Sequence, residues 1–308
     1  MYVDSPSGSD ARRPPAAIAD YRIVRALGAG SHGVCYLALP PDRLALGIEH
    51  VALKVFSNPV GEDAFHRGVR ELRTFSDVRS THLLRLYEAA LGDQFMYSMA
   101  YLPGGSMAAP AMPLHREQAL AILEGAARGA HELHEAGLVH GDIMPGNVLI
   151  GGDEDGPVGV LGALGLARVI TAATAVSGVG SSATLEFADP DMLVGQSPSR
   201  ATDLWALGAT IHRTLTGEGL YGELPDMQPL VAIRTVQSTK PVLSPALSSA
   251  ERDLVSECLA PHDDRFRTAA ELADRIAEIA GRGRSLSVRP RRTAPGSDRS
   301  PGRPPGGR

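Results

Sequence analysis

A short glycine-rich segment near the N-terminus contains residue types that could hold a phosphate group. It reads Gly28-Ala29-Gly30-Ser31-His32-Gly33 and separates two strand-like runs, 21–27 and 34–39. Because glycine has no Cβ, backbone N–H groups in such a turn can approach phosphate oxygens closely. A tight hairpin without a ligand explains the glycines equally well. Since a strand rather than a helix follows, the segment does not fit a dinucleotide-binding fingerprint.

Lys54 is the second candidate for contact with an anion. The chain has only two lysines, Lys54 and Lys240, against 28 arginines. Arginine is therefore used wherever any cation is sufficient, and a lysine indicates a place where arginine would not serve. We can name no such role for Lys240. Lys54 lies inside an apolar run, 51–56, so a simple surface lysine is the weaker interpretation.

The elements that must position these groups change in type along the chain. The first part has strand-like runs separated by Gly and Pro-Asp, with one charged helical stretch. After Pro103-Gly104-Gly105 the apolar spacing becomes helical. The expected strands are 21–27, 34–39, 51–56, 83–90 and 95–101, and the expected helices are 62–78, 116–136, 203–215 and one that Thr268 caps. Strands followed by helices predict an α+β protein with a small sheet lobe and a helical lobe.

The stretch His140-Gly141-Asp142-Ile143-Met144-Pro145-Gly146-Asn147 resembles the catalytic loop of protein kinases, H-x-D-x-K-P-x-N. Asp203-Leu204-Trp205-Ala206-Leu207-Gly208 matches the D-x-W-x-x-G helix of Ser/Thr kinases. The resemblance covers about residues 20–280 and is strongest to bacterial Ser/Thr protein kinases of the eukaryotic type. Small-molecule phosphotransferases with an H-G-D-x-x-P-x-N loop are the second choice.

The resemblance implies a bilobal kinase-like fold of the α+β class. A small antiparallel-sheet N-lobe with one helix would span about residues 20–101, and a larger helical C-lobe about 106–280. Residues 1–19 and 281–308 are expected to be disordered, since both are rich in residues that cannot build a core.

The resemblance also implies the residues of a nucleotide site. Lys54 would pair with the α- and β-phosphates and be held by Glu71, with Glu62 as the alternative. Asp142 would accept the proton of a substrate hydroxyl, and Asn147 would hold a metal ion. The implied nucleotide-binding residues are Gly28, Gly30, Gly33, Cys35, Ala52, Lys54, Glu71, Met99, Tyr101 and Leu149.

Further residues have structural roles in the resemblance. His140 and Leu164, with Phe75 and Asp203, would form a packed column between the lobes. In Ala188-Asp189-Pro190-Asp191, which resembles A-P-E, Asp191 would take the glutamate's place and pair with Arg265.

The chain departs from the kinase pattern at two positions that matter for catalysis. Met144 stands where kinases have the catalytic-loop lysine, and Ala163 stands at the metal-binding aspartate of D-F-G. A methyl group offers Mg²⁺ no oxygen ligand, and a thioether does not stabilise a moving phosphoryl group. Losing one such electrostatic contact typically costs about 10²–10³ in rate. The acidic turn 153–155 is a conceivable replacement, although a solvated loop explains it better.

Three functions are therefore weighed. The first is a pseudokinase, a regulatory or scaffolding module that binds ATP with little or no transfer, so that Mg²⁺ or Mn²⁺ is doubtful. Its partner would be another protein: an active kinase, a substrate or an effector. The second is a working Ser/Thr kinase with unusual metal use and Asp142 as base. The third acts through the basic tail 281–308, which carries a net charge of +7 and could bind nucleic acid.

The bulk composition favours a soluble protein of the cell interior. No apolar run approaches the roughly 20 residues that span a bilayer, and residues 1–15 lack the apolar core of a secretion signal. Only two cysteines, Cys35 and Cys258, are present, so no disulfide framework is indicated. We expect a cytoplasmic protein with no membrane partner.

Overall fold

The computed structural model describes residues 15–30, 33–57, 62–92, 94–153, 156–162, 182–225 and 228–281. These residues form two lobes, one built on an antiparallel sheet and one built mainly on helices. The predicted α+β bilobal fold is therefore confirmed. Residues 1–14 and 282–308 lie outside the described residues, so the disorder expected of them stays a prediction.

The N-lobe contains a six-stranded antiparallel sheet with the spatial order β1-β2-β3-β4-β6-β5. The strands are β1 (Ala17–Ile18), β2 (Tyr21–Gly30), β3 (Gly33–Leu39), β4 (Val51–Phe56), β5 (Leu86–Leu91) and β6 (Phe95–Ala100). One helix, α1 (Glu62–Asp77), accompanies the sheet. The sheet begins earlier than expected. Strand β1 lies within residues 1–19, which were predicted to be unstructured, and it pairs with β2.

The two faces of β4 pack against different parts of the molecule. Leu53 and Val55 join a cluster confined to the N-lobe. Phe56, on the other face, belongs to the main core that also contains Phe75 of α1 and residues of the C-lobe. Because side chains alternate across a strand, Lys54 shares the face of Phe56 and points toward the junction of the lobes.

A second, smaller sheet lies where the lobes meet. It has the order β10-β9-β7-β8, with β7 (Gly105–Ser106), β8 (Ala109–Pro110), β9 (Val148–Asp153) and β10 (Gly156–Leu161). The N–H of Leu84 donates to the oxygen of Leu161 at 2.9 Å, and the N–H of Leu161 donates to the oxygen of His82 at 2.8 Å. These backbone bonds fix the end of β10 to the segment that leads into β5.

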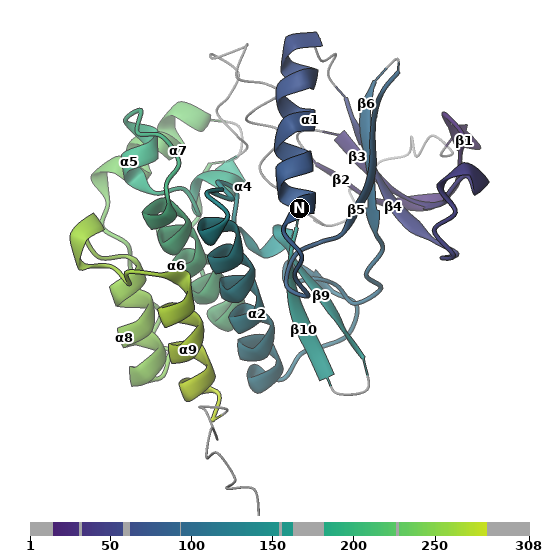
Figure 1. Ribbon diagram of the computed structural model, residues 1–308. Coiled ribbons are helices and arrows are strands. Elements are labelled where there is room, and N and C mark those ends of the chain that lie inside the picture. The colour runs from purple at the N-terminus through teal and green to yellow at the C-terminus, as the bar shows by residue number, and fades with distance from the viewer. Residues whose placement is uncertain are drawn as a thin grey trace, which may run out of the picture.

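The rest of the C-lobe is helical. Its helices are α2 (Arg116–Glu135), α4 (Ser182–Leu185), α5 (Pro190–Leu193), α6 (Arg200–Thr216), α7 (Pro229–Ser238), α8 (Ser249–Cys258) and α9 (Ala269–Ile279). Figure 1 shows α6, α8 and α9 gathered on the side of α2 away from the N-lobe sheet. Among the described residues, no helix is both long enough and apolar enough to cross a membrane.

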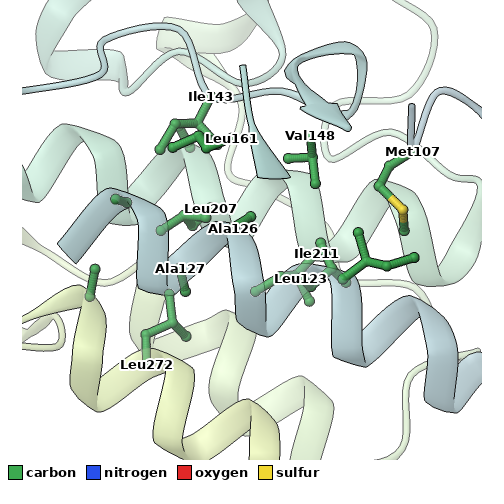
Figure 2. Close-up of a cluster of buried hydrophobic side chains, with 14 of the residues drawn as sticks. Met107, Leu123, Ala126, Ala127, Ile143, Val148, Leu161, Leu207, Ile211 and Leu272 are labelled. Carbon is green, nitrogen blue, oxygen red and sulfur yellow. The ribbon is translucent and has the colours of Figure 1, made fainter. Parts of the chain in front are cut away.

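Helix α2 is the centre of the C-lobe core. Figure 2 shows its Leu123, Ala126 and Ala127 between side chains of α6, of α9 and of the segments above them. A Cβ on Gly125 would lie 2.6 Å from the oxygen of Gly159, and one on Gly159 would lie 1.8 Å from the oxygen of Ile122. Two glycines facing each other therefore let α2 touch the backbone of β10.

Helix α6 begins three residues before the expected start at Asp203. Ser199 is its N-cap: the Ser199 hydroxyl accepts from the N–H of Thr202, and the Thr202 hydroxyl accepts from the N–H of Ser199. This reciprocal pair stabilises the first turn much as a capping box does. As a result Asp203 lies one turn inside the helix, where its side chain is buried.

Candidate functional site

A cleft opens between the N-lobe sheet and the small sheet of the C-lobe. Strands β2, β3, β4 and β6 form one wall, and residues at the ends of β9 and β10 form the other. The residues lining it are Leu27, Gly28, Ala29, Gly33, Cys35, Ala52, Lys54, Leu84, Tyr97, Met99, Ala100, Tyr101, Leu102, Gly105, Gly146, Asn147, Leu149 and Gly162. Eight of the ten residues expected to bind a nucleotide are among them; the exceptions are Gly30 and Glu71.

The glycine-rich segment is a β-hairpin over the cleft. Gly28 pairs with Cys35, and Gly30 pairs with Gly33. Gly33 has φ +147°, and a Cβ there would lie 1.9 Å from the oxygen of Val55, so the close approach of β4 requires glycine. The tip, Ser31-His32, lies outside the described residues, and its contact with a phosphate stays a prediction.

The middle of the sheet presents a row of three protic side chains to the cleft. Lys54 is paired in register with Cys35 on β3 and with Tyr97 on β6. Tyr97 was not identified from the sequence. The alternation of side chains along β6 could have found it, because a strand that turns Met99 into the cleft also turns residue 97 there.

The helix partner expected for Lys54 is not described in enough detail to test the pairing. Glu71 belongs to α1, but its side chain lies outside the described residues, as do Glu62's side chain, Ala163 and Leu164. The Lys54–Glu71 ion pair and the packing of Leu164 onto His140 therefore stay predictions. Phe75, the other member of that column, is buried on α1.

Asp203 organises the loop that carries the candidate catalytic residues. Its Oδ2 accepts the N–H of His140 at 2.8 Å and lies 2.8 Å from Nε2 of His134, and its Oδ1 accepts the N–H of Gly141 at 2.8 Å. The structure thus brings Asp203 and His140 together through a hydrogen bond from the His140 backbone N–H to the Asp203 carboxylate. The carboxylate of α6 fixes where this loop begins.

His140 joins the loop to the end of β10. Its Nε2 is 3.1 Å from the oxygen of Gly162, and its Nδ1 is 3.2 Å from the backbone nitrogen of Asp142. A neutral ring with the proton on Nε2 satisfies both bonds. Burial lowers the pKa of His140 and outweighs the opposing effect of the Asp203 and Asp142 carboxylates. The imidazole is therefore a neutral structural link.

Asp142 and Asn147 face each other across the loop. The amide nitrogen of Asn147 donates to the backbone oxygen of Asp142 at 2.6 Å and to its Oδ2 at 2.9 Å. The carboxylate is thereby oriented, and within the described residues its other oxygen, Oδ1, has no hydrogen-bond partner. In chemical terms this is an acceptor suited to a hydroxyl proton, held beside the cleft that Asn147 also lines.

Met144 points away from the nucleotide cleft. It is buried in a C-lobe cluster with Phe187, Ala209, Leu220, Tyr221 and Val236. It also lines a small cavity of about 20 Å³ that includes Asp142 and Thr184. A lysine at this position could place its ammonium beside Asp142, but the thioether of methionine provides no charge there.

The expected pairing of Arg265 with Asp191 is wrong. Nη1 of Arg265 lies 2.5 Å from Oδ2 of Asp189, and both side chains are almost fully buried. Asp189 is the N-cap of α5 and accepts the N–H of Asp191, which leaves Asp191 in the first turn with its side chain exposed. At the start of α5 the buried carboxylate is therefore that of Asp189, and not that of Asp191.

The residues that we can place do not form a metal site of protein ligands. Among the described residues, no three His, Cys, Asp or Glu side chains gather in a way that could hold an ion. Asp153, which begins the acidic turn, lies at the opposite end of the β9–β10 hairpin from Asn147, because it pairs with Gly156 while Val148 pairs with Leu161. With Ala163 unable to ligate, Asn147 is a single neutral ligand, which fits Mg²⁺ poorly.

The comparisons with known proteins agree with this geometry. The family described as "Protein kinase domain" matches residues 21–275. The Ser/Thr protein kinase PknJ of Mycobacterium tuberculosis is 29% identical over 276 residues, which are 85% of this chain and 46% of that protein. The Ser/Thr protein kinase Pkn2 of Myxococcus xanthus is 30% identical over 214 residues, covering 67% of this chain and 25% of Pkn2.

A solved structure gives the same result for the fold. The crystal structure of the Mycobacterium tuberculosis PknI kinase domain, determined as a double mutant, is similar with a TM-score of 0.64 and 25% identity. The similarity covers 85% of this chain and 96% of that kinase domain. By contrast, the chain spans less than half the length of the bacterial relatives above.

Proposed function

Because this chain belongs to the protein kinase family, we propose that it is a kinase-fold module that binds ATP and transfers phosphate weakly or not at all. One observation carries the proposal. Lys54, Ala52, Met99 and Leu149 line a cleft of the right composition, whereas Met144, at the position of the catalytic lysine, is buried in an apolar cluster. The nucleotide-binding half is retained while the charge that would assist transfer is missing.

The residues of the cleft fit an adenine nucleotide. Ala52, Met99 and Leu149 provide apolar surfaces for a flat ring, and residues 100–102 provide backbone groups at one edge. Lys54 provides a cation for the phosphates. ATP bound there would bring the transferable phosphoryl group, and Asp142 and Asn147 would orient a hydroxyl beside it. Because Ala163 cannot bind a metal, we expect nucleotide binding that does not depend on Mg²⁺ or Mn²⁺.

The alternative is an active Ser/Thr protein kinase with unusual metal use. The Asp142–Asn147 pair favours it, because the carboxylate is held in an orientation suited to accept a proton. The named relatives are Ser/Thr protein kinases, which also favours it. This alternative predicts phosphate incorporation that disappears in Asp142→Asn.

As a pseudokinase, the chain would act on another protein, either an active kinase, its substrate or an effector, in the cytoplasm. A role for the basic tail in binding nucleic acid is a separate hypothesis, since residues 282–308 lie outside the described residues. Salt-sensitive nucleic-acid binding that is lost on deleting 281–308 would support the tail hypothesis.

The decisive experiment measures the thermal stability of the full chain with ATP in the presence of Mg²⁺, Mn²⁺ or EDTA. A stabilising shift that is the same in EDTA supports the proposal. The two lysines provide a matched pair of variants: Lys54→Ala should abolish the shift, and Lys240→Ala, an exposed lysine outside the cleft, should retain it. A shift that requires metal would instead make the active kinase the better description.

A second experiment asks whether the two substitutions cause the loss of transfer. We expect the double variant Met144→Lys, Ala163→Asp to incorporate phosphate at a rate roughly 10²-fold or more above that of the natural chain. A further Asp142→Asn change should remove this gain. The natural chain should incorporate no more phosphate than its own Asp142→Asn variant. The pseudokinase proposal would be overturned if the natural chain and the double variant incorporated phosphate equally and if Asp142→Asn removed the incorporation in both.

A further inference from the structure

Tyr97 is a large polar side chain on the cleft wall to which the proposed function gives no role. It lies on β6, directly opposite Lys54 in the antiparallel register, and its side chain lines the cleft. Only 7% of its surface is exposed. Its ring packs against Phe56 and Phe95, with centroids 6.1 Å and 6.4 Å away. The ring is therefore fixed by aromatic packing and cannot swing out into solvent.

Within the described residues, the hydroxyl of Tyr97 makes no hydrogen bond. Tyr21, another deeply buried tyrosine of the same sheet, shows the usual arrangement: its hydroxyl lies 2.7 Å from Oε2 of Glu88 and 2.9 Å from Oγ of Ser98. The hydroxyl of a mostly buried tyrosine normally takes a partner from the protein, from water or from a bound ligand, and Tyr97 lines the cleft. The cleft is the place from which Tyr97 can obtain its partner.

The surroundings decide what kind of partner this is. Burial, with added effects of Cys35 and Asp142, holds the pKa of Tyr97 far above its usual value, so the phenol keeps its proton and is a donor. Its register neighbour Lys54 is a cation. Tyr97 lines the same cleft as Asn147 and pairs in register with Lys54, the cation proposed for the phosphates, so it lies toward the phosphate end of the cleft. A protonated donor next to an ammonium group suits an anionic acceptor.

We propose that Tyr97 is a ligand-binding residue whose hydroxyl donates a hydrogen bond to a phosphate of the bound nucleotide, beside Lys54. This inference rests on the proposed function and deepens it. A phenol and an ammonium group together bind phosphate oxygens without a metal ion, which is the condition that Ala163 imposes on this chain. The pair forms a phosphate subsite from two adjacent strands, β4 and β6.

The test uses the full-length chain with Tyr97→Phe, which removes the hydroxyl and keeps the ring in its aromatic packing. Binding of ATP, ADP and adenosine is measured by isothermal titration calorimetry in EDTA. We expect ATP and ADP to bind roughly 10- to 100-fold more weakly to Tyr97→Phe, as for the loss of a hydrogen bond to a charged group, and adenosine to bind equally to both proteins.

The matched control is Tyr36→Phe, because Tyr36 lies on β3 of the same sheet but packs on the opposite face. It should bind all three ligands as the natural chain does. Equal affinity of Tyr97→Phe for the phosphorylated ligands would overturn the inference while leaving the proposed function intact. An equal loss for adenosine would overturn the assignment to phosphate. If the natural chain binds none of the three ligands, the proposed function itself fails, and the inference fails with it.

Discussion

Nη1 of Arg265 lies 2.5 Å from Oδ2 of Asp189, in an ion pair whose side chains are 3% and 2% exposed. The guanidinium also donates to the oxygens of Ala260 and Ala201 and lies over the ring of Trp205, 5.1 Å from its centroid. A single arginine thus joins the start of α5, the first turn of α6 and the segment before α9. The pair stabilises the part of the C-lobe that surrounds the small cavity lined by Asp142 and Asp189.

Asp189→Asn should destabilise the protein by about 3 kcal/mol, because it leaves the buried Arg265 charge without its counterion. Asparagine can still accept the N–H of Asp191, so the helix cap is kept and the loss reports the ion pair. Urea unfolding of the full chain measures it. The matched control is Asp191→Asn, two residues away and exposed, which should change the stability by less than about 0.5 kcal/mol. A larger loss of stability in Asp191→Asn than in Asp189→Asn would instead support the Arg265–Asp191 pairing expected from the sequence.

The Arg265–Asp189 ion pair shows why the sequence alone did not identify the carboxylate that binds Arg265. The A-P-E resemblance aligns Asp191 with the family's glutamate, and both candidate carboxylates flank Pro190. Which of them points inward depends on the direction in which α5 leaves its N-cap, and tertiary packing decides that direction. By comparison, the resemblance to kinases implied Ala52, Met99 and Leu149 as cleft residues, and the structure has all three in the cleft lining.

The order and type of the elements were also predictable, since apolar periodicity and glycine positions report them directly. Tyr97 was within reach of the same reasoning and was missed, because only Met99 of that strand was carried over from the resemblance. The start of α6 was missed because Ser199 forms its reciprocal cap with a threonine rather than with glutamate or glutamine.

Gly159→Ala should destabilise the protein by about 2 kcal/mol or more. The new Cβ would lie 1.8 Å from the oxygen of Ile122, so α2 and β10 would have to move apart at the centre of the C-lobe core. The control is Gly92→Ala, because in the described part of the chain no atom beyond the adjoining residues lies within 4 Å of a Cβ at that position. Thermal unfolding of both variants measures the difference. Comparable melting temperatures would contradict the tight contact between these elements.

Asp203→Asn should weaken both the fold and the site. In the natural chain each carboxylate oxygen of Asp203 accepts a backbone N–H, one from His140 and one from Gly141. Asparagine has only one acceptor oxygen, so its NH₂ group would face the other N–H donor and leave it without an acceptor. We expect a loss of about 2 kcal/mol in the free energy of unfolding, with weaker ATP binding because the loop 140–147 loses its anchor. Asp253→Asn on α8 is a suitable control, since no hydrogen bond or ion pair of the Asp253 side chain is found within the described residues. Unchanged unfolding and ATP binding in Asp203→Asn would show that the loop holds its position without the carboxylate.

Glu251 makes part of the stability depend on acid pH. Its hydrogen bond with Arg116, 2.6 Å between Nη2 and Oε2, is the main cause that lowers the pKa of Glu251 from 4.5 to about 2, and the Ser248 hydroxyl and N–H contribute further. A carboxyl whose pKa is lower in the folded state stabilises the fold fully above its unfolded pKa. That contribution should decrease as the pH falls below about 4.5 and be lost near pH 2.

The measurement is urea unfolding of the natural chain and of Glu251→Gln between about pH 7 and pH 2. At neutral pH the natural chain should be the more stable of the two, and the difference should shrink steadily between about pH 4.5 and pH 2, because protonated Glu251 resembles glutamine in charge. Asp253→Asn is again the control, because it lies on the same helix without a partner in the described structure and should follow the natural chain throughout. A difference between the natural chain and Glu251→Gln that does not change with pH would show that the Arg116–Glu251 bond contributes by packing rather than by charge.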